Sequence, residues 1–165
     1  GEEIDFDGCV EWVFKVEGGR LKEEGGVLLV EGVGGLLAPL AKGKTVASLG
    51  QVLGSKLIII AQNRVGVINH VLLTLEAALS RGLSVASVIL MEQEKPDSSA
   101  VDNAELIRIH MSNTPGFMGI FEFPFLGKGA DNPELITINV KKSERVLKRI
   151  FDEVFKPYFI NVLRN

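Results

Sequence analysis

One short segment combines a carboxylate with glycines in a way that suits an ionic ligand. Glu31 directly follows the apolar run 26–30, and Gly32, Gly34 and Gly35 come immediately after it. A carboxylate can bind Mg²⁺ directly or through water, and glycines let backbone N–H groups approach an oxyanion without side-chain interference. A tight turn carrying a solvated glutamate explains the same residues, and from this segment alone that simpler interpretation is slightly favoured.

A second segment, NRVGVINH at 63–70, has the residues of an anion site at the start of a helix. Gly66 lies where the helix should begin, and Asn69 lies in its first turn. Free backbone N–H groups and the helix dipole attract an anion there, and a first-turn asparagine can add an amide donor. Ordinary capping by Asn63 or Asn69 is the alternative.

Two other features of the sequence do not indicate a phosphate-binding or metal site. The GKT at Gly43–Thr45 resembles the end of a phosphate-binding loop, but the required glycine five residues before the Gly-Lys pair is replaced by Ala38. We therefore expect Lys44 at a solvated surface. His70 and His110 each lack a nearby cysteine or second histidine, so neither predicts a metal site.

Hydrophobic patterns predict the elements that position these residues. Continuous apolar runs predict strands at 26–30, 56–62, 83–91 and 116–123. Helical spacing of apolar residues predicts helices at 3–23, at Thr45–Leu53, between Gly66 and Gly82, and at Ala104–Met111. Strands that alternate with helices indicate an α/β fold with a mainly parallel sheet flanked by helices, and we expect one domain over residues 1–165.

A last helix is predicted near the end of the chain, with Ser143 as its cap and Pro157 as its end. Polar loops are expected at 92–103 and 127–133. The predicted core face of this helix comprises Val146, Leu147, Ile150, Phe151, Val154 and Phe155.

The predicted topology brings the candidate residues toward one edge of the sheet. In open parallel sheets, ligands bind beyond the carboxyl ends of the strands. Glu31, the 63–70 segment and the residues near Met91 each follow a predicted strand. We therefore expect a ligand site that draws on all three.

The composition bounds the function class. The chain has 165 residues, of which 46% are hydrophobic and 24% charged, as in an ordinary globular domain. A net charge of −3 does not favour nucleic acid or an anionic membrane as partner. The lone Cys9 and the acidic start of the chain, which is unlike a signal peptide, fit a cytoplasmic protein. No apolar run is long enough to cross a bilayer.

Taken together, the segments resemble dethiobiotin synthetase, the ATP-dependent enzyme that closes the ureido ring of the biotin precursor. Residues 30–40, VEGVGGLLAPL, are similar to that family's V-E-G-A-G-G…P-L segment, and residues 66–74 match its G-x-I-N-H-x-x-L-T segment. The resemblance is strongest over Val27–Leu90. An E-G-x-G-G segment alone also occurs in amidotransferase-like ligases of cobalamin synthesis.

The resemblance implies a P-loop-type α/β fold, usually a homodimer, and roles for several residues. Glu31 would be a Mg²⁺ ligand beside the ATP phosphates, and the Gly32–Gly35 loop, through Gly34 and Gly35, would lie near phosphate or substrate. Gly66, Val67 and Asn69 would grip the carboxylate of 7,8-diaminopelargonate. In that chemistry the diamine takes up CO₂ as a carbamate, ATP phosphorylates it, and the second amine closes the ring.

The sequence also departs from the family. The family's P-loop is expected far upstream of Glu31, and residues 1–30 contain none, so the sequence looks like the second half of the family, from a truncated gene, a cleaved protein or a split enzyme. The family's adenine-reading asparagine is replaced by Met91, which puts an adenine region around Met91 and Pro124 in doubt.

Two function classes therefore stay open at this point. The first is a dethiobiotin synthetase-like ligase of biotin biosynthesis, incomplete or inactive as this chain alone. The second is a non-catalytic small-ligand-binding or assembly protein derived from that fold. Half of a related cobalamin-pathway ligase is a further alternative, which Asn69 and the I-N-H spacing disfavour. For the first class we expect a homodimer or higher assembly that buries an uncovered sheet edge.

Overall fold

The structure is a computed structural model of the chain, and it describes residues 4–16, 27–129 and 132–156. Its centre is a parallel sheet of three strands in the order β3-β4-β5. These strands are β3 (Lys56–Gln62), β4 (Ser84–Met91) and β5 (Gly119–Phe123). A separate antiparallel pair joins β1 (Pro39–Ala41) to β2 (Lys44–Thr45).

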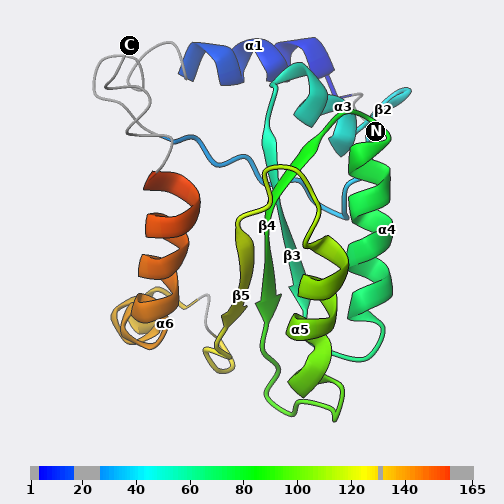
Figure 1. Cartoon of the computed structure of the whole chain (residues 1–165). Coiled ribbons are helices and arrows are strands. Elements are labelled where there is room, and N and C mark those ends of the chain that lie inside the picture. Colours follow the sequence, from blue (N-terminus) through cyan, green and yellow to red (C-terminus); the bar gives the residue numbers. More distant parts are fainter. Residues whose placement is uncertain (1–3, 17–26, 130–131, 157–165) are drawn as a thin grey trace.

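Helices cover both faces of the sheet (Figure 1). On one face, α4 (Val67–Leu79) packs on β3 and β4, α5 (Ala100–Met111) packs on β5, and the two helices enclose the larger hydrophobic core. On the other face, α6 (Ile136–Ile150) and the π-helical turn Phe151–Phe155 pack on β4 and β5. A short 3₁₀ turn, Pro133–Leu135, precedes α6. The expected α/β fold, a mainly parallel sheet flanked by helices, is thus confirmed.

Two further helices lie near the amino ends of the strands (Figure 1). The first, α1 (Phe6–Val16), is shorter than the predicted helix 3–23, and residues 17–23 of that prediction fall outside the described residues. The second, α3 (Val46–Val52), confirms the prediction Thr45–Leu53, because these two residues are its caps. Gly54 follows with a φ of +60°, the left-handed conformation that suits glycine after a helix.

The predicted strand at 26–30 is wrong for the residues that the structure describes. Residues 27–30 belong to no strand, and the side chain of Leu29 is 70% exposed. An apolar run becomes a buried strand only if a neighbouring strand pairs with its backbone, and none of the described strands does so. Glu31 therefore follows an extended surface segment rather than the end of a strand.

The strands predicted at 56–62, 83–91 and 116–123 are present, although β5 begins at Gly119 rather than at 116, and β3 is not equally covered along its length. The central strand β4 is buried from Val85 to Leu90. In β3 the side chain of Ile60 is 65% exposed, and the far edge of β3 has no neighbour among the described strands. Its sequence resembles that of a central strand, whereas its position here is an edge.

Two further helices begin at other residues than predicted. The helix α5 begins at Ala100, four residues before the predicted start, so the loop after β4 is shorter than 92–103. The helix α6 begins at Ile136, so Ser143 is not its cap. Ser143 is buried in mid-helix and donates its hydroxyl to the Asn139 carbonyl at 2.8 Å. The serine thus satisfies its own hydroxyl one turn back within the helix.

The predicted core face of the last helix is right for four of its six members. Ile150 and Val154 are buried, and Val146 and Phe155 pack at the margin of the core. Leu147 is 43% exposed and Phe151 is 49% exposed, because the sheet covers a narrower sector of the helix than the apolar stripe spans. The predicted end at Pro157 lies outside the described residues. Within the described residues, no helix has the length and apolar character needed to span a membrane.

Candidate functional site

The loops after β3 and β4 meet at the carboxyl edge of the sheet, at the lower end of the view in Figure 1. The loop 63–66 joins β3 to α4, and the loop 92–99 joins β4 to α5. Each continues the hydrogen-bond pattern of the sheet by one residue: the Asn63 N–H donates to the Met91 carbonyl, and the Glu92 N–H donates to the Phe123 carbonyl, both at 2.8 Å. These loops are therefore fixed extensions of the strands.

The first turn of α4 presents unpaired donors to its surroundings. Gly66 is the N-cap, with a φ of +88°, and no side chain caps the helix. The Val67 N–H bonds to the Arg64 carbonyl at 3.1 Å, whereas the N–H groups of Ile68 and Asn69 have no acceptor among the described residues. With the helix dipole, these donors make the turn an electropositive site.

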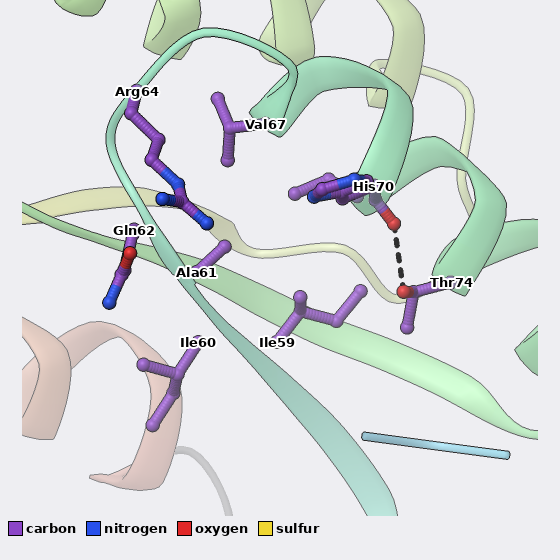
Figure 2. A pocket seen from close by; sticks show the side chains of 9 residues that line it. Ile59, Ile60, Ala61, Gln62, Arg64, Val67, His70 and Thr74 are labelled. Atoms are coloured by element: carbon purple, nitrogen blue, oxygen red, sulfur yellow. Dashed lines mark hydrogen bonds between the residues drawn. The ribbon is translucent and has the colours of Figure 1, made fainter. Parts of the chain in front are cut away.

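A shallow hollow of about 220 Å³ lies beside this turn, between α4 and the free edge of β3 (Figure 2). Arg64 and His70 lie on opposite sides of the hollow with Val67 between them. Arg64 is exposed and forms no ion pair within the described residues. The lining comprises Ile59, Ile60, Ala61, Gln62, Arg64, Val67, His70, Val71 and Thr74. Chemically, the region offers cationic and N–H groups above an apolar floor.

The three residues predicted for a carboxylate, Gly66, Val67 and Asn69, thus lie together at the start of α4. Asn69 is exposed, and its side chain makes no hydrogen bond within the described part of the chain. Capping, the alternative interpretation, does not apply, because neither Asn63 nor Asn69 caps the helix. An anion that approached this turn would meet free donors.

Asn63 instead belongs to a buried polar network that the sequence reasoning missed. Its side chain is fully buried. Its amide group donates to Glu92 Oε1 at 2.7 Å and to the Ala100 carbonyl at 3.1 Å. Its carbonyl oxygen accepts from Asn103 Nδ2 at 2.8 Å. The position of Asn63 at the end of an apolar strand could have indicated this network, since a buried polar side chain needs hydrogen-bond partners from other segments.

Asp97 forms a second link between the same loops. One carboxylate oxygen accepts from the Val65 N–H at 2.9 Å, and the other accepts from the Ser99 N–H at 2.9 Å and from the Ser99 hydroxyl. These bonds, first the one from the Ser99 hydroxyl and then the one from Val65, lower the pKa of Asp97 from its ordinary value. The ionised carboxylate therefore suits its partners at neutral pH.

The structure does not bring Glu31 to this edge. The segment 27–38 begins near the upper end of α6, below α1, and crosses the strands in the upper half of the view before it rises to α3, whereas the 63–66 loop lies at the lower end (Figure 1). Glu31 is exposed, and Gly34 and Gly35 adopt left-handed φ angles of +85° and +99°. Gly32 lies so close to Val46 that an added Cβ would be 2.4 Å from it. These glycines shape a turn onto α3.

Met91 and Pro124 lie at the ends of β4 and β5, near the same carboxyl edge. Both side chains are half-buried. The Met91 side chain packs on the α6-side core, and its carbonyl accepts from the Asn63 N–H. A thioether in the core has no strong donor or acceptor for an adenine edge, so the geometry adds nothing to an adenine region here.

The described residues do not fit a complete site for Mg²⁺ or ATP phosphates. Among them, no group of three or more His, Cys, Asp or Glu side chains could hold a metal ion, so Glu31 is a single candidate ligand. Gly43 lies in the turn between β1 and β2, and the Thr45 side chain caps α3 by accepting from the Ser48 N–H. Gly43–Thr45 is thus a structural turn and cap.

Comparisons with known proteins connect this geometry to a family. A family model described as an AAA domain matches residues 1–128. An ATP-dependent dethiobiotin synthetase of Anaeromyxobacter sp. (strain Fw109-5) is 33% identical over 111 residues, which are 66% of this chain and 48% of that protein. The Bacillus subtilis (strain 168) protein of the same name is 37% identical over 90 residues, covering 54% of this chain and 39% of that protein.

A third relative, the ATP-dependent dethiobiotin synthetase of Anaeromyxobacter sp. (strain K), is 39% identical over 84 residues, which are 50% of this chain and 38% of that protein. The chain thus spans about half the length, or less, of the curated relatives it matches. No solved structure matches it significantly. All three relatives share one name, so they give no support to the cobalamin-pathway alternative.

Proposed function

This chain belongs to the AAA domain family that contains dethiobiotin synthetase, and on that premise we propose that it binds the carboxylate of 7,8-diaminopelargonate at the start of α4. The role would be the substrate-holding part of the Mg²⁺- and ATP-dependent carboxylation and ring closure that makes dethiobiotin. Its relatives are named ATP-dependent dethiobiotin synthetases, and the proposal carries that activity class to this chain.

One observation carries the proposal: free donors and a cation surround the first turn of α4. The N–H groups of Ile68 and Asn69 lack acceptors among the described residues, and the Asn69 amide is exposed beside them. Arg64, two residues before the Gly66 N-cap, adds a positive charge and lines the hollow beside this turn. A carboxylate bound there would receive charge-assisted hydrogen bonds, and an aliphatic chain could lie on the apolar floor formed by Ile59 and Val71.

The nucleotide side of the reaction has less support from the described residues. In the proposal Glu31 is a Mg²⁺ ligand, and Gly32, Gly34 and Gly35 lie near phosphate or substrate. When bound, ATP with Mg²⁺ would supply the phosphoryl group that activates the carbamate of the diamine. Because the described residues do not form a complete site for either group, we derive no catalytic step through them. A non-catalytic carboxylate-binding protein is the second candidate, favoured by Met91 at the adenine position.

We further propose that the free edge of β3 is buried in a homodimer or higher assembly in the cytoplasm. Ile60 is 65% exposed and Leu73 on the adjacent α4 is 55% exposed. None of the described strands pairs with this edge of β3. Open apolar strand edges invite pairing with another chain, which supports an assembly through this surface.

Separate calorimetric titrations with 7,8-diaminopelargonate and with Mg²⁺–ATP test the proposal. We expect heat from the diamine acid and none after Asn69→Ala, with Asn113→Ala as the matched control, because Asn113 is an exposed asparagine in the α5–β5 connection. Binding of the diamine acid alone supports a substrate-holding protein. ATP binding would show that the nucleotide side is more complete than the described residues indicate. Absence of diamine-acid binding contradicts the proposal.

A further inference from the structure

Two side chains that no function has yet used, Asn63 and Asp97, join the loops at the carboxyl edge of the sheet. Asn63 holds Glu92 and the start of α5 through its amide, and it accepts from Asn103 through its carbonyl oxygen. Asp97 holds the Val65 N–H from the opposite loop. Three bonds of 2.9 Å or shorter therefore link the residues before Gly66 to the segment 92–103.

These hydrogen bonds lie directly before the first turn of α4, so they can fix the orientation of that turn. Asn63 and Val65 lie on either side of Arg64, and Gly66 and the first turn of α4 follow immediately. The turn has no side-chain cap of its own. The helix itself holds the loop only through backbone bonds to the Arg64 and Gly66 carbonyls, so the contacts from outside the helix help to fix its orientation, since an uncapped helix start otherwise frays.

We propose that Asn63 and Asp97 are positioning residues, which hold the free N–H groups of Ile68 and Asn69 in one orientation toward a bound carboxylate. This inference rests on the proposed carboxylate function of the same turn. It adds that the loop 92–99 sets the affinity of the site through its bonds to Val65 and Asn63. The two loops then act as one unit at the carboxyl edge.

The two residues are not equally suited to a test. Asn63→Ala leaves Glu92 and the buried Asn103 amide without their partner, and the variant can fail to fold for that reason alone. Asp97 is exposed, so Asp97→Ala removes the hold on Val65 without opening a cavity. Asp97→Asn keeps one oxygen that can still accept from the Val65 N–H, so it serves as the conservative variant.

The decisive experiment measures amide hydrogen exchange by NMR and diaminopelargonate affinity by calorimetry on the full chain. In Asp97→Ala we expect exchange of the Val65 amide to rise about tenfold and affinity to fall about fivefold, in a chain that still folds with a melting temperature lowered by only about a few degrees. Asp97→Asn should recover part of both effects. Asp102→Ala is the matched control, because this exposed carboxylate in the first turn of α5 makes no side-chain hydrogen bond among the described residues.

The outcomes separate this inference from the proposed function. Exchange in Asp97→Ala equal to that in Asp102→Ala overturns the positioning role. If the wild type binds the diamine acid, faster amide exchange in Asp97→Ala with an affinity equal to that of the wild type also overturns the positioning role. If the wild type binds no diamine acid, the carboxylate function fails, and exchange at residues 65–69 alone supports or overturns the claim that Asp97 holds this turn.

Discussion

The side-chain amide of Asn103, in α5, donates a hydrogen bond of 2.8 Å to Asn63 Oδ1, directly after β3. The two residues are 40 positions apart in the sequence. Both side chains are buried, so neither has water as an alternative partner. The contact connects the helix after β4 to the loop that begins α4. Stability and ligand binding at the carboxyl edge are therefore expected to share these residues.

Asn103→Ala should lower the free energy of unfolding by about 2 kcal/mol, because it leaves the buried Asn63 carbonyl oxygen without a donor. Urea denaturation followed by circular dichroism measures the change. Asn113→Ala, at an exposed asparagine, should change stability by less than about 0.5 kcal/mol. Equal effects of the two substitutions would show that the Asn63–Asn103 contact adds no stability.

Asp97 predicts a pH dependence with a definite sign. Its pKa in the folded protein lies below the ordinary value of 3.8, so the unfolded chain binds a proton more readily. The stabilisation is complete above the unfolded pKa and is lost as the pH falls through the folded pKa. Urea midpoints measured between about pH 6 and about pH 3 should therefore fall less steeply for Asp97→Asn than for the wild type. A steeper fall for this variant would contradict the assignment.

Replacing Gly66 should destabilise the protein through backbone strain. Its φ of +88° lies in the left-handed region, while an added Cβ would meet no atom within 4 Å. Gly66→Ala should therefore destabilise the protein by about 1 kcal/mol through conformation alone. Gly66→Asn should cost less, since asparagine tolerates this region better than alanine does. Thermal melts of the two variants test the order, and an alanine variant as stable as the asparagine variant would refute it.

Ile60→Lys tests whether the free edge of β3 is an assembly surface. A lysine at an exposed edge disfavours pairing with another chain, so we expect a smaller particle by multi-angle light scattering. Val101→Lys is the control, because Val101 is 81% exposed on α5, away from β3. A wild type that is already monomeric at high concentration, or an unchanged mass in Ile60→Lys, would count against an interface at this edge.

The sequence predicted the parts of the fold whose patterns are local. Leu57–Ile60 and Val85–Leu90 are apolar runs that form parallel strands, and Gly54 and Gly82 follow helices with left-handed φ angles. The sequence-based prediction failed where pairing with another segment decides whether a strand forms. Residues 27–30 have the composition of a buried strand, but none of the described strands pairs with them.

In the candidate site, too, local features could be predicted and contacts between distant segments could not. Gly66, Val67 and Asn69 could be placed together because they are close in sequence and begin one helix. Asn63, Asn103 and Asp97 could not, because their contacts join segments about thirty to forty residues apart. Glu31 was expected at the carboxyl edge only through a strand that the described structure does not contain.

The most direct test of the account is a titration of the ¹⁵N-labelled chain with 7,8-diaminopelargonate, followed by amide chemical shifts. We expect the largest shifts at Gly66, Val67 and Asn69, with small shifts at Gly54 and Gly82 at the opposite end of the sheet. Shifts that are absent from the first turn of α4, or that are larger at Gly54 and Gly82, would contradict a carboxylate site at this helix.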